Sequence, residues 1–337
     1  MKPVELSAVL ERLTSEGLLE TADCAVLRVA LDFKLTGFAS LDLAGPADAS
    51  FWLGSAVKNE TNANSFDSGT LSRVGAGLIF VPRGCLEEVK GLFVNAGALV
   101  PVENPYHAMV RFLECFAGEP VGACSVAQSA RVHASAVVEG CVGENAVVGP
   151  GCVVMRGATL GAGCVLEANV TVYPNVVVGE NCVFQAGAVI GSRGFGFYEY
   201  DGRRRPVPHL AGVRIGRDCG FGANMVVAAG FLSPTTIGDR CHFDSFVQVA
   251  HNCRLGNDIY MASQSGLAGS VIVEDDVELA GGAQVAGHLT LGKGCRIAAK
   301  AGVTKSIPAG KVVSGFPAED ITVWRRSMVR LRQMGKK

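Results

Sequence analysis

The sequence predicts a mainly β protein whose central part is a parallel β-helix of hexapeptide repeats. An α/β domain precedes this part, and a helix follows it. From Val142 to Val303, an aliphatic or aromatic residue recurs at every sixth position apart from two interruptions. A fixed period of six is typical of stacked coils, whereas an amphipathic helix repeats every 3.6 residues and a strand every two. The 43 glycines among 337 residues supply the frequent turns that such coils require.

The repeat divides the chain into three predicted parts. Residues 1–117 lack the period of six and form an N-terminal α/β domain. A linker rich in small residues, 118–125, leads to the solenoid over 126–317. Residues 318–337 form a basic C-terminal helix, with apolar residues at helical spacing and several arginines. This helix could recognise an acidic partner, cap the open end of the solenoid, or do both.

Within the N-terminal domain, local patterns predict the elements. Apolar residues over 4–13 have helical spacing, and the apolar segments 76–81 and 98–100 read as buried strands. Asn104 as N-cap and Pro105 at the first helical position start a second helix.

The two interruptions of the repeat span 196–214 and 233–236. Loops expelled from a rigid solenoid are common places for binding sites. The first loop carries Arg203, Arg204 and Arg205, and a solvated surface turn fits these arginines as well as a functional loop does.

Composition excludes several classes of protein. The formal net charge is −1, which gives no reason to expect a nucleic-acid partner. No run of 18 apolar residues exists, and the first residues are charged rather than signal-like. We therefore expect a cytoplasmic protein with no integral membrane segment.

The cysteines are expected to be structural. No C-x-x-C pair occurs, and seven of the twelve cysteines take the fifth place of a hexapeptide, where other repeats have Ala or Val. Cysteine then acts as a small buried hydrophobe. These seven are Cys152, Cys164, Cys182, Cys219, Cys241, Cys253 and Cys295. We expect no metal and no cofactor.

The candidate chemistry centres on His251. If three hexapeptides make one coil, residues 18 apart stack, so Gly269 lies beside His251 and Gly287 follows one coil later, next to His288. A neutral imidazole can take a proton from an attacking amine or hydroxyl. Asp244, seven residues earlier, could orient it, and the Gly269 amide could donate to an oxyanion.

Two other interpretations of these histidines stay open. His251 could be a satisfied surface or inter-subunit histidine with no chemistry. A zinc site, as in a γ-type carbonic anhydrase, would need three placed ligands, and His242, His251 and His288 do not fall on an 18-residue ladder.

The motifs around these residues resemble the UDP-3-O-acylglucosamine N-acyltransferases of lipid A biosynthesis. The likeness covers nearly the whole chain, and Gln248-Val249-Ala250-His251-Asn252 in register with the repeat is its most specific part. The matching segments are 37–41, 47–51, 104–106, 168–173, 194–197, 248–252 and 314–318.

The resemblance implies a left-handed β-helix that forms a homotrimer, with active sites between neighbouring solenoids. It implies transfer of a (3R)-3-hydroxyacyl chain from acyl carrier protein to the 2-amino group of a UDP-linked amino sugar. His251 matches the general base, Asp244 its orienting carboxylate and Gly269 the oxyanion donor. His288 matches a histidine near the phosphates.

The same resemblance suggests where the substrates bind. Phe51 matches an aromatic that stacks on uracil, and Phe195 and Phe197 belong to a matching motif that we expect to contact substrate. The basic C-terminal helix would face the acidic carrier protein, with its contacts at Arg325, Arg326 and Arg330.

This chain departs from the family pattern at two places. Gly54 and Val57 stand where the family shows an asparagine and a tyrosine, and 226–230 lacks two charged residues. These departures keep two alternatives open. One is an O- or N-acyltransferase acting on another nucleotide-linked sugar, and the other is a non-catalytic hexapeptide scaffold.

Overall fold

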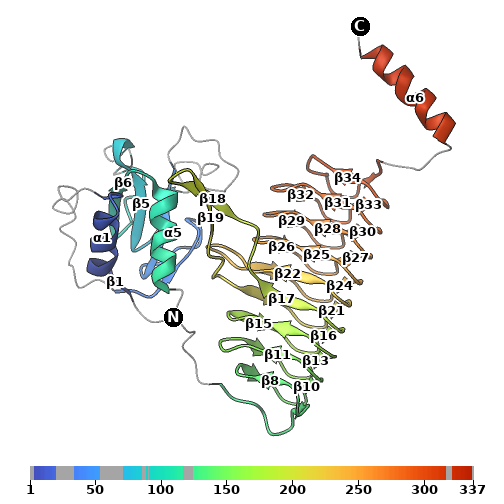
Figure 1. Cartoon of the computed structure of the whole chain (residues 1–337), viewed down its shortest axis with the longest axis horizontal. Helices are drawn as coiled ribbons and strands as arrows, with labels where there is room; N and C mark the ends of the chain where they lie inside the picture. The colour runs from blue at the N-terminus through green and yellow to red at the C-terminus, as the bar shows by residue number, and fades with distance from the viewer. Residues whose placement is uncertain are drawn as a thin grey trace.

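The predicted architecture is confirmed by the computed structural model, which describes residues 4–19, 34–53, 71–85, 89, 91–116, 124–315 and 321–335. A long parallel β-solenoid lies beside a smaller α/β domain, and a helix follows the last coil (Figure 1). No helix in the described part of the chain combines the length and the hydrophobicity needed to cross a membrane.

The solenoid is a prism with three parallel sheets, to each of which a complete coil contributes one short strand. The first sheet consists of β7 (Arg131–Val132), β10 (Val147–Val148), β13 (Val165–Leu166), β16 (Val183–Phe184), β21 (Gly220–Phe221), β24 (His242–Phe243), β27 (Tyr260–Met261), β30 (Glu278–Leu279), β33 (Arg296–Ile297) and β35 (Val312–Val313). The second consists of β8 (Val137–Val138), β11 (Val153–Val154), β14 (Thr171–Val172), β17 (Val189–Ser192), β22 (Val226–Ala228), β25 (Gln248–Val249), β28 (Gly266–Leu267), β31 (Gln284–Val285) and β34 (Gly302–Val303). The third consists of β9 (Cys141–Val142), β12 (Thr159–Leu160), β15 (Val176–Val178), β20 (Val213–Ile215), β23 (Thr235–Ile237), β26 (Arg254–Leu255), β29 (Ile272–Val273) and β32 (Thr290–Leu291).

Register follows the sequence period. In regular coils, residues 18 apart pair across neighbouring strands, as Val147 does with Val165. The sixth-position residues point into the prism and are buried, and Phe184, Phe221 and Phe243 form a stacked column inside it, with ring centres 4.5 and 5.3 Å apart. A strand of two or three residues cannot bury much surface alone, so stacking provides the core.

The cysteines of the repeat are free and buried in this core, as expected. Their thiols donate to carbonyl oxygens of the next coil, for example from Cys164 Sγ to Gly179 O at 3.1 Å and from Cys253 Sγ to Ala268 O at 3.2 Å. Among the described residues, no group of three or more His, Cys, Asp or Glu is placed to share a metal ion.

The N-terminal part contains a four-stranded parallel sheet with two packed helices. The elements are β1 (Val4–Glu5), α1 (Leu6–Ser15), β2 (Lys34–Leu35), β3 (Gly37–Phe38), β4 (Asp48–Phe51), β5 (Leu78–Pro82), the 3₁₀ turn η1 (Arg83–Cys85), β6 (Ala98–Val102) and α5 (Pro105–Phe116). The predicted cap of α5 is confirmed, since the Asn104 Oδ1 accepts from the His107 N–H at 3.0 Å. Glu16, which directly follows α1, and Arg111 of α5 form an ion pair that ties the two helices together.

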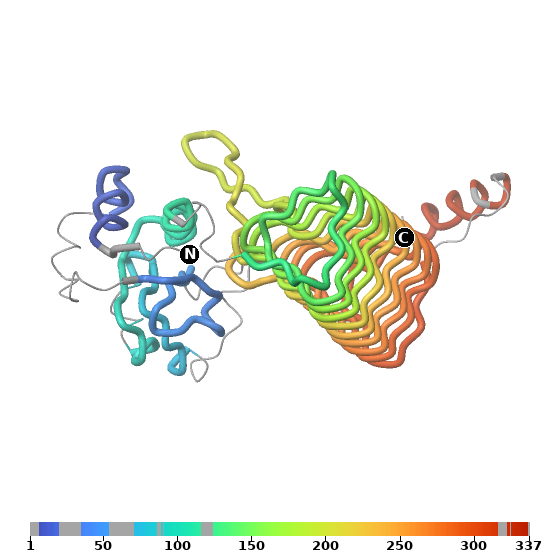
Figure 2. Tube along the Cα trace, turned by 90° about the horizontal axis from the view of Figure 1, so that it is seen from below, coloured from blue at the N-terminus to red at the C-terminus, as the bar shows by residue number. Residues whose placement is uncertain are grey.

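The first interruption of the repeat is a hairpin, β18 (Phe197–Tyr200) and β19 (Arg203–Pro206), whose tip projects from the molecule in Figure 2. Its tyrosines pack on α5, with the ring of Tyr200 4.1 Å and that of Tyr198 5.2 Å from the ring of His107. Leu232, directly before the second interruption, belongs to the core of the N-terminal part. Both interruptions therefore join the solenoid to the α/β part.

The C-terminal helix α6 (Ile321–Met334) lies apart from the last coil in Figure 1. Val323, Val329 and Leu331 on it are exposed. Within one chain, α6 therefore does not cap the open end of the solenoid.

Candidate active site

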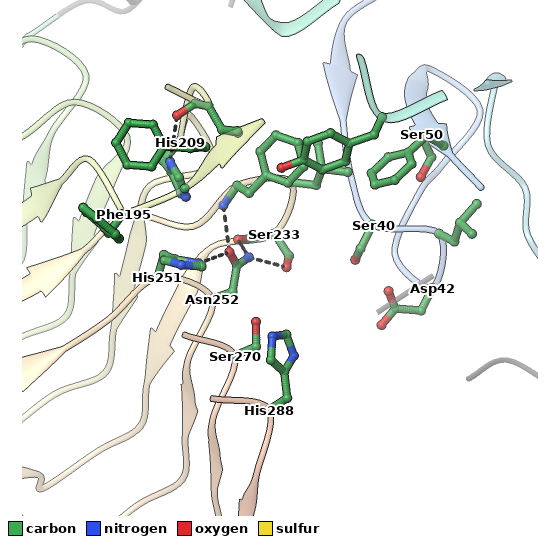
Figure 3. A pocket seen from close by; sticks show the side chains of 18 residues that line it. Ser40, Asp42, Ser50, Phe195, His209, Ser233, His251, Asn252, Ser270 and His288 are labelled. Carbon is green, nitrogen blue, oxygen red and sulfur yellow. Dashed lines mark hydrogen bonds between the residues drawn. The ribbon is translucent and has the colours of Figure 1, made fainter. Parts of the chain in front are cut away.

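A cavity of about 290 Å³ lies where the α/β part, both interruptions and one corner of the solenoid meet (Figure 3). We call this corner the His251 corner. It comprises the turns that join the second sheet to the third in three successive coils, residues 250–253, 268–271 and 286–289. The solenoid thus supplies a rigid wall and the inserted loops supply the cover.

The His251 corner confirms the stacking inferred from the sequence. The Ser270 N–H donates to the His251 carbonyl at 3.0 Å, and the His288 N–H donates to the Gly269 carbonyl at 3.0 Å. His251, Gly269 and Gly287 therefore form one column. A second column, Asn252, Ser270 and His288, adopts the left-handed backbone conformation that these tight turns require, with φ of 61°, 63° and 61°.

The imidazole of His251 lies directly against the backbone of Gly269. A Cβ atom on Gly269 would stand 2.7 Å from Cε1 and 2.8 Å from Nε2 of that ring, closer than real Cβ atoms come to any neighbour. The φ angle of Gly269 is not positive, so any residue could adopt this backbone conformation. Glycine is needed here because a side chain would have no room. The Gly269 N–H donates no hydrogen bond to any residue that the structure describes, which leaves it available to a ligand.

The tautomer of His251 is fixed by Asn252. Asn252 Oδ1 accepts from the Phe231 N–H at 3.1 Å, and its Nδ2 donates to the Ser233 carbonyl at 2.9 Å, so the amide orientation is determined. The same Oδ1 lies 3.1 Å from His251 Nδ1, which must therefore carry the proton. In neutral His251, Nε2 is consequently the free acceptor.

The second interruption of the repeat holds this amide in place. The Ser233 carbonyl accepts from Nδ2 of Asn252. Thr235 Oγ1 accepts from the backbone N–H of Asn252 at 2.9 Å and donates to the Ala228 carbonyl at 2.7 Å. Thr235 is fully buried. The short loop that breaks the sequence period is therefore what orients the candidate base.

Within one chain the structure does not bring Asp244 to His251, so the orienting role of Asp244 stays a prediction. Asp244 is exposed at the preceding corner, where its carboxylate accepts from the N–H groups of Ser245 at 2.7 Å and Ser263 at 3.2 Å. An offset of seven residues spans a strand, β25, and so places the two side chains at successive corners of the prism. Asn252, adjacent in sequence, takes the orienting place instead.

The other predicted substrate contacts do line the cavity. Phe195 and Phe197 stand at its edge with ring centres 5.0 Å apart, and Phe195 is 88% exposed. His288 lies below His251 on the same wall (Figure 3). Phe51 lines the opposite side but is only 5% exposed, because its ring packs edge-on against Tyr106.

The α/β side of the cavity carries unused polar groups. The hydroxyls of Ser40 and Ser50 are buried, line the cavity and have no hydrogen-bond partner among the residues that the structure describes. Burial raises the pKa of Tyr106 to about 12, so its hydroxyl stays protonated. Asp42 is the only Asp, Glu, Lys or Arg among the lining residues that the structure describes. The cavity therefore offers hydroxyls, imidazoles and aromatic rings in a largely apolar setting.

Sequence reasoning missed His209, which is buried and lines the cavity beside His251, with ring centres 4.9 Å apart. It lies inside the first interruption, where no period locates it. Ser270 was also missed, although counting 18 residues from Asn252 finds it. Gly54 and Val57 lie outside the described residues.

The predicted carrier-protein contacts lie outside the cavity, and the segment 226–230 is apolar. Arg325, Arg326 and Arg330 are exposed on α6, away from the cavity. Ala228 and Ala229, in the segment that lacks the family's charges, are buried beside the second interruption. Apolar packing replaces charge there.

Comparisons with known proteins found matches in sequence and in structure. Residues 157–192 match the bacterial transferase hexapeptide family, and residues 212–244 match the hexapeptide repeat of succinyl-transferases. The solved UDP-N-acetylglucosamine acyltransferase of Francisella novicida aligns with 60% of this chain and 73% of its own, at 25% identity and a TM-score of 0.49.

Two relatives define the family. The UDP-3-O-acylglucosamine N-acyltransferase of Paraburkholderia phymatum is 50% identical over 160 residues, a match that spans 45% of each chain. The enzyme of the same name from Pseudomonas paraeruginosa is 32% identical over 325 residues, which cover 92% of this chain and 88% of that relative. The chain therefore belongs to the UDP-3-O-acylglucosamine N-acyltransferase family.

Proposed function

We propose that this protein transfers a 3-hydroxyacyl chain from acyl carrier protein to the 2-amino group of a UDP-linked 3-O-acylglucosamine, a step of lipid A biosynthesis. His251 is the general base. The observation that carries this proposal is the imidazole of His251 lying against the Gly269 amide, with its tautomer fixed by Asn252. Family membership supports the choice of substrates.

The proposed reaction follows from the positions of these groups. The acceptor amine attacks the thioester carbonyl, and His251 Nε2 takes a proton from the attacking nitrogen. A C–N bond forms, and the carbonyl oxygen becomes an oxyanion to which the Gly269 N–H donates. The C–S bond then breaks, and the proton held by His251 passes to the departing thiolate.

No protein nucleophile is required in this scheme. The hydroxyls of Ser233 and Ser270 also line the cavity, and neither is hydrogen-bonded to the His251 ring in the described structure. The amide of Asn252 orients the imidazole of His251 without placing a negative charge beside it.

The proposal includes a homotrimer and a docked carrier. Within one chain, Asp244 does not reach the His251 corner. In a homotrimer, Asp244 of a neighbouring copy could approach it. The exposed Arg325, Arg326 and Arg330 on α6 would meet the acidic surface of the carrier protein.

The test is a turnover assay with a mixed 3-hydroxyacyl-carrier pool and UDP-3-O-acylglucosamine, with products identified by mass spectrometry. We expect an amide product. An ester product, or turnover only with acetyl-CoA or with another nucleotide-linked sugar, would contradict the assignment in favour of a related transferase. No product together with no calorimetric binding of UDP would favour the scaffold.

A further inference from the structure

We propose that His209 presents a second imidazole acceptor to the same amine that His251 deprotonates, and that this pair of acceptors selects an amine over a hydroxyl. This inference rests on the proposed function, since it concerns the acceptor of that reaction. It assigns a substrate contact to a side chain that the sequence motifs do not identify.

The two rings share the cavity. His209 is buried, its exposed edge lines the cavity, and its ring centre is 4.9 Å from that of His251. Figure 3 shows the imidazole of His209 directed from the hairpin side toward His251. One nitrogen that donates two hydrogen bonds of about 2.9 Å spans acceptors up to roughly 5 Å apart. The ring separation is compatible with such a bridge.

The tautomer of His209 leaves the required nitrogen free. Its Nδ1 lies 2.9 Å from the Val207 carbonyl, which can only accept, so Nδ1 carries the proton. Burial, together with the nearby His251 and Arg193, lowers the pKa of His209 to about 4, so the ring is neutral near pH 7. Nε2 is then an acceptor, as Nε2 of His251 is.

The glycines of the Gly194-Phe195-Gly196-Phe197 segment make this arrangement possible. A Cβ on Gly194 would stand 2.7 Å from both Nε2 of His209 and Cβ of His251. A Cβ on Gly196 would stand 2.8 Å from Cε1 of His209. The loop therefore passes close to the ring of His209 and to Cβ of His251, and both histidines line the cavity.

The chemistry of the acceptor explains the selectivity. An amine or ammonium has at least two N–H groups and can donate to both Nε2 atoms, whereas a hydroxyl has one O–H. A bound hydroxyl leaves one buried acceptor unsatisfied, and sites built around a substrate N–H discriminate strongly against analogues that lack it.

The test compares two nucleotides that differ at one substituent, UDP-glucosamine and UDP-glucose, by calorimetry with the full chain. We expect the wild-type protein to bind the amine roughly tenfold more tightly. His209→Leu should bring the two affinities close together, while His209→Gln, which keeps an acceptor oxygen, should retain most of the preference. Equal binding by the wild type, or an unchanged preference in His209→Leu, overturns the proposal.

A second measurement does not depend on any variant. In protein labelled with ¹⁵N-histidine, Nε2 of His209 should be unprotonated at pH 7 and should shift with UDP-glucosamine more than with UDP-glucose. A protonated Nε2 would overturn the inference.

The two proposals can fail separately. An amide product with no role for His209 in the preference overturns this inference alone. A preference that depends on His209, without acyl transfer, removes the proposed function and leaves the acceptor site standing.

Discussion

Replacing Gly269 with alanine adds one methyl group at the point where the proposed base meets the solenoid backbone. That methyl carbon would stand 2.7 Å from Cε1 and 2.8 Å from Nε2 of His251, whereas ordinary contact begins near 3.4 Å. The ring must therefore retreat by roughly 0.7 Å, and a displacement of about 1 Å can cost 10²-fold in rate. We expect kcat/KM to fall by roughly 10²-fold while the fold persists.

The assay is amide formation followed by mass spectrometry, with Gly281→Ala as the matched control. Gly281 occupies a turn of another corner, and a Cβ there meets only the Ser263 carbonyl at an ordinary 3.6 Å. If the effect acts through the imidazole, Gly269→Ala should add little to His251→Ala. A folded Gly269→Ala protein with wild-type kcat/KM would refute the proposed role of this contact.

Three further predictions concern orientation and stability. Asn252→Ala removes the acceptor for His251 Nδ1, so kcat measured by the same assay should fall by about 10²-fold. An unchanged kcat would show that the reaction does not depend on the tautomer that Asn252 fixes. Phe221→Ala empties the stacked aromatic column and should lower the free energy of unfolding by about 3–5 kcal/mol in guanidinium titrations, and a loss below about 1 kcal/mol would contradict the packing. The hydrogen bond from Arg111 lowers the pKa of Glu16, so this stabilisation is present at neutral pH and disappears as the pH falls through the lowered pKa. Glu16→Gln should therefore lower Tm at pH 7 but not at an acidic pH below the lowered pKa of Glu16, and an equal loss at both pH values would exclude the ion pair as its cause.

The fold could be predicted from the sequence because one geometric rule governs the solenoid. Each sixth residue points inward, so the period itself reports the number of residues in each side of the prism. The helix that begins at Pro105 was predictable for a local reason, because the preceding residue, Asn104, caps it. Neither inference required knowledge of distant contacts.

The candidate site was predictable only where it follows the same rule. Gly269 lies on the 18-residue ladder from His251, and His288 stands next to Gly287 on that ladder, so both were found. Asp244 does not lie beside His251 within one chain, because β25 places the two residues at successive corners, so its role stays a prediction. His209 sits on an insertion whose path is set by packing against α5, and no period encodes that path.

The measurement that tests the central claim most directly is the turnover of His251→Ala with acyl carrier protein and UDP-3-O-acylglucosamine. His133→Ala serves as the control, because His133 is exposed at the start of the solenoid and lies outside the cavity. The account predicts a loss of roughly 10²–10⁴ in kcat for His251→Ala with the fold intact, and no loss for His133→Ala. Full turnover by a folded His251→Ala protein would contradict it.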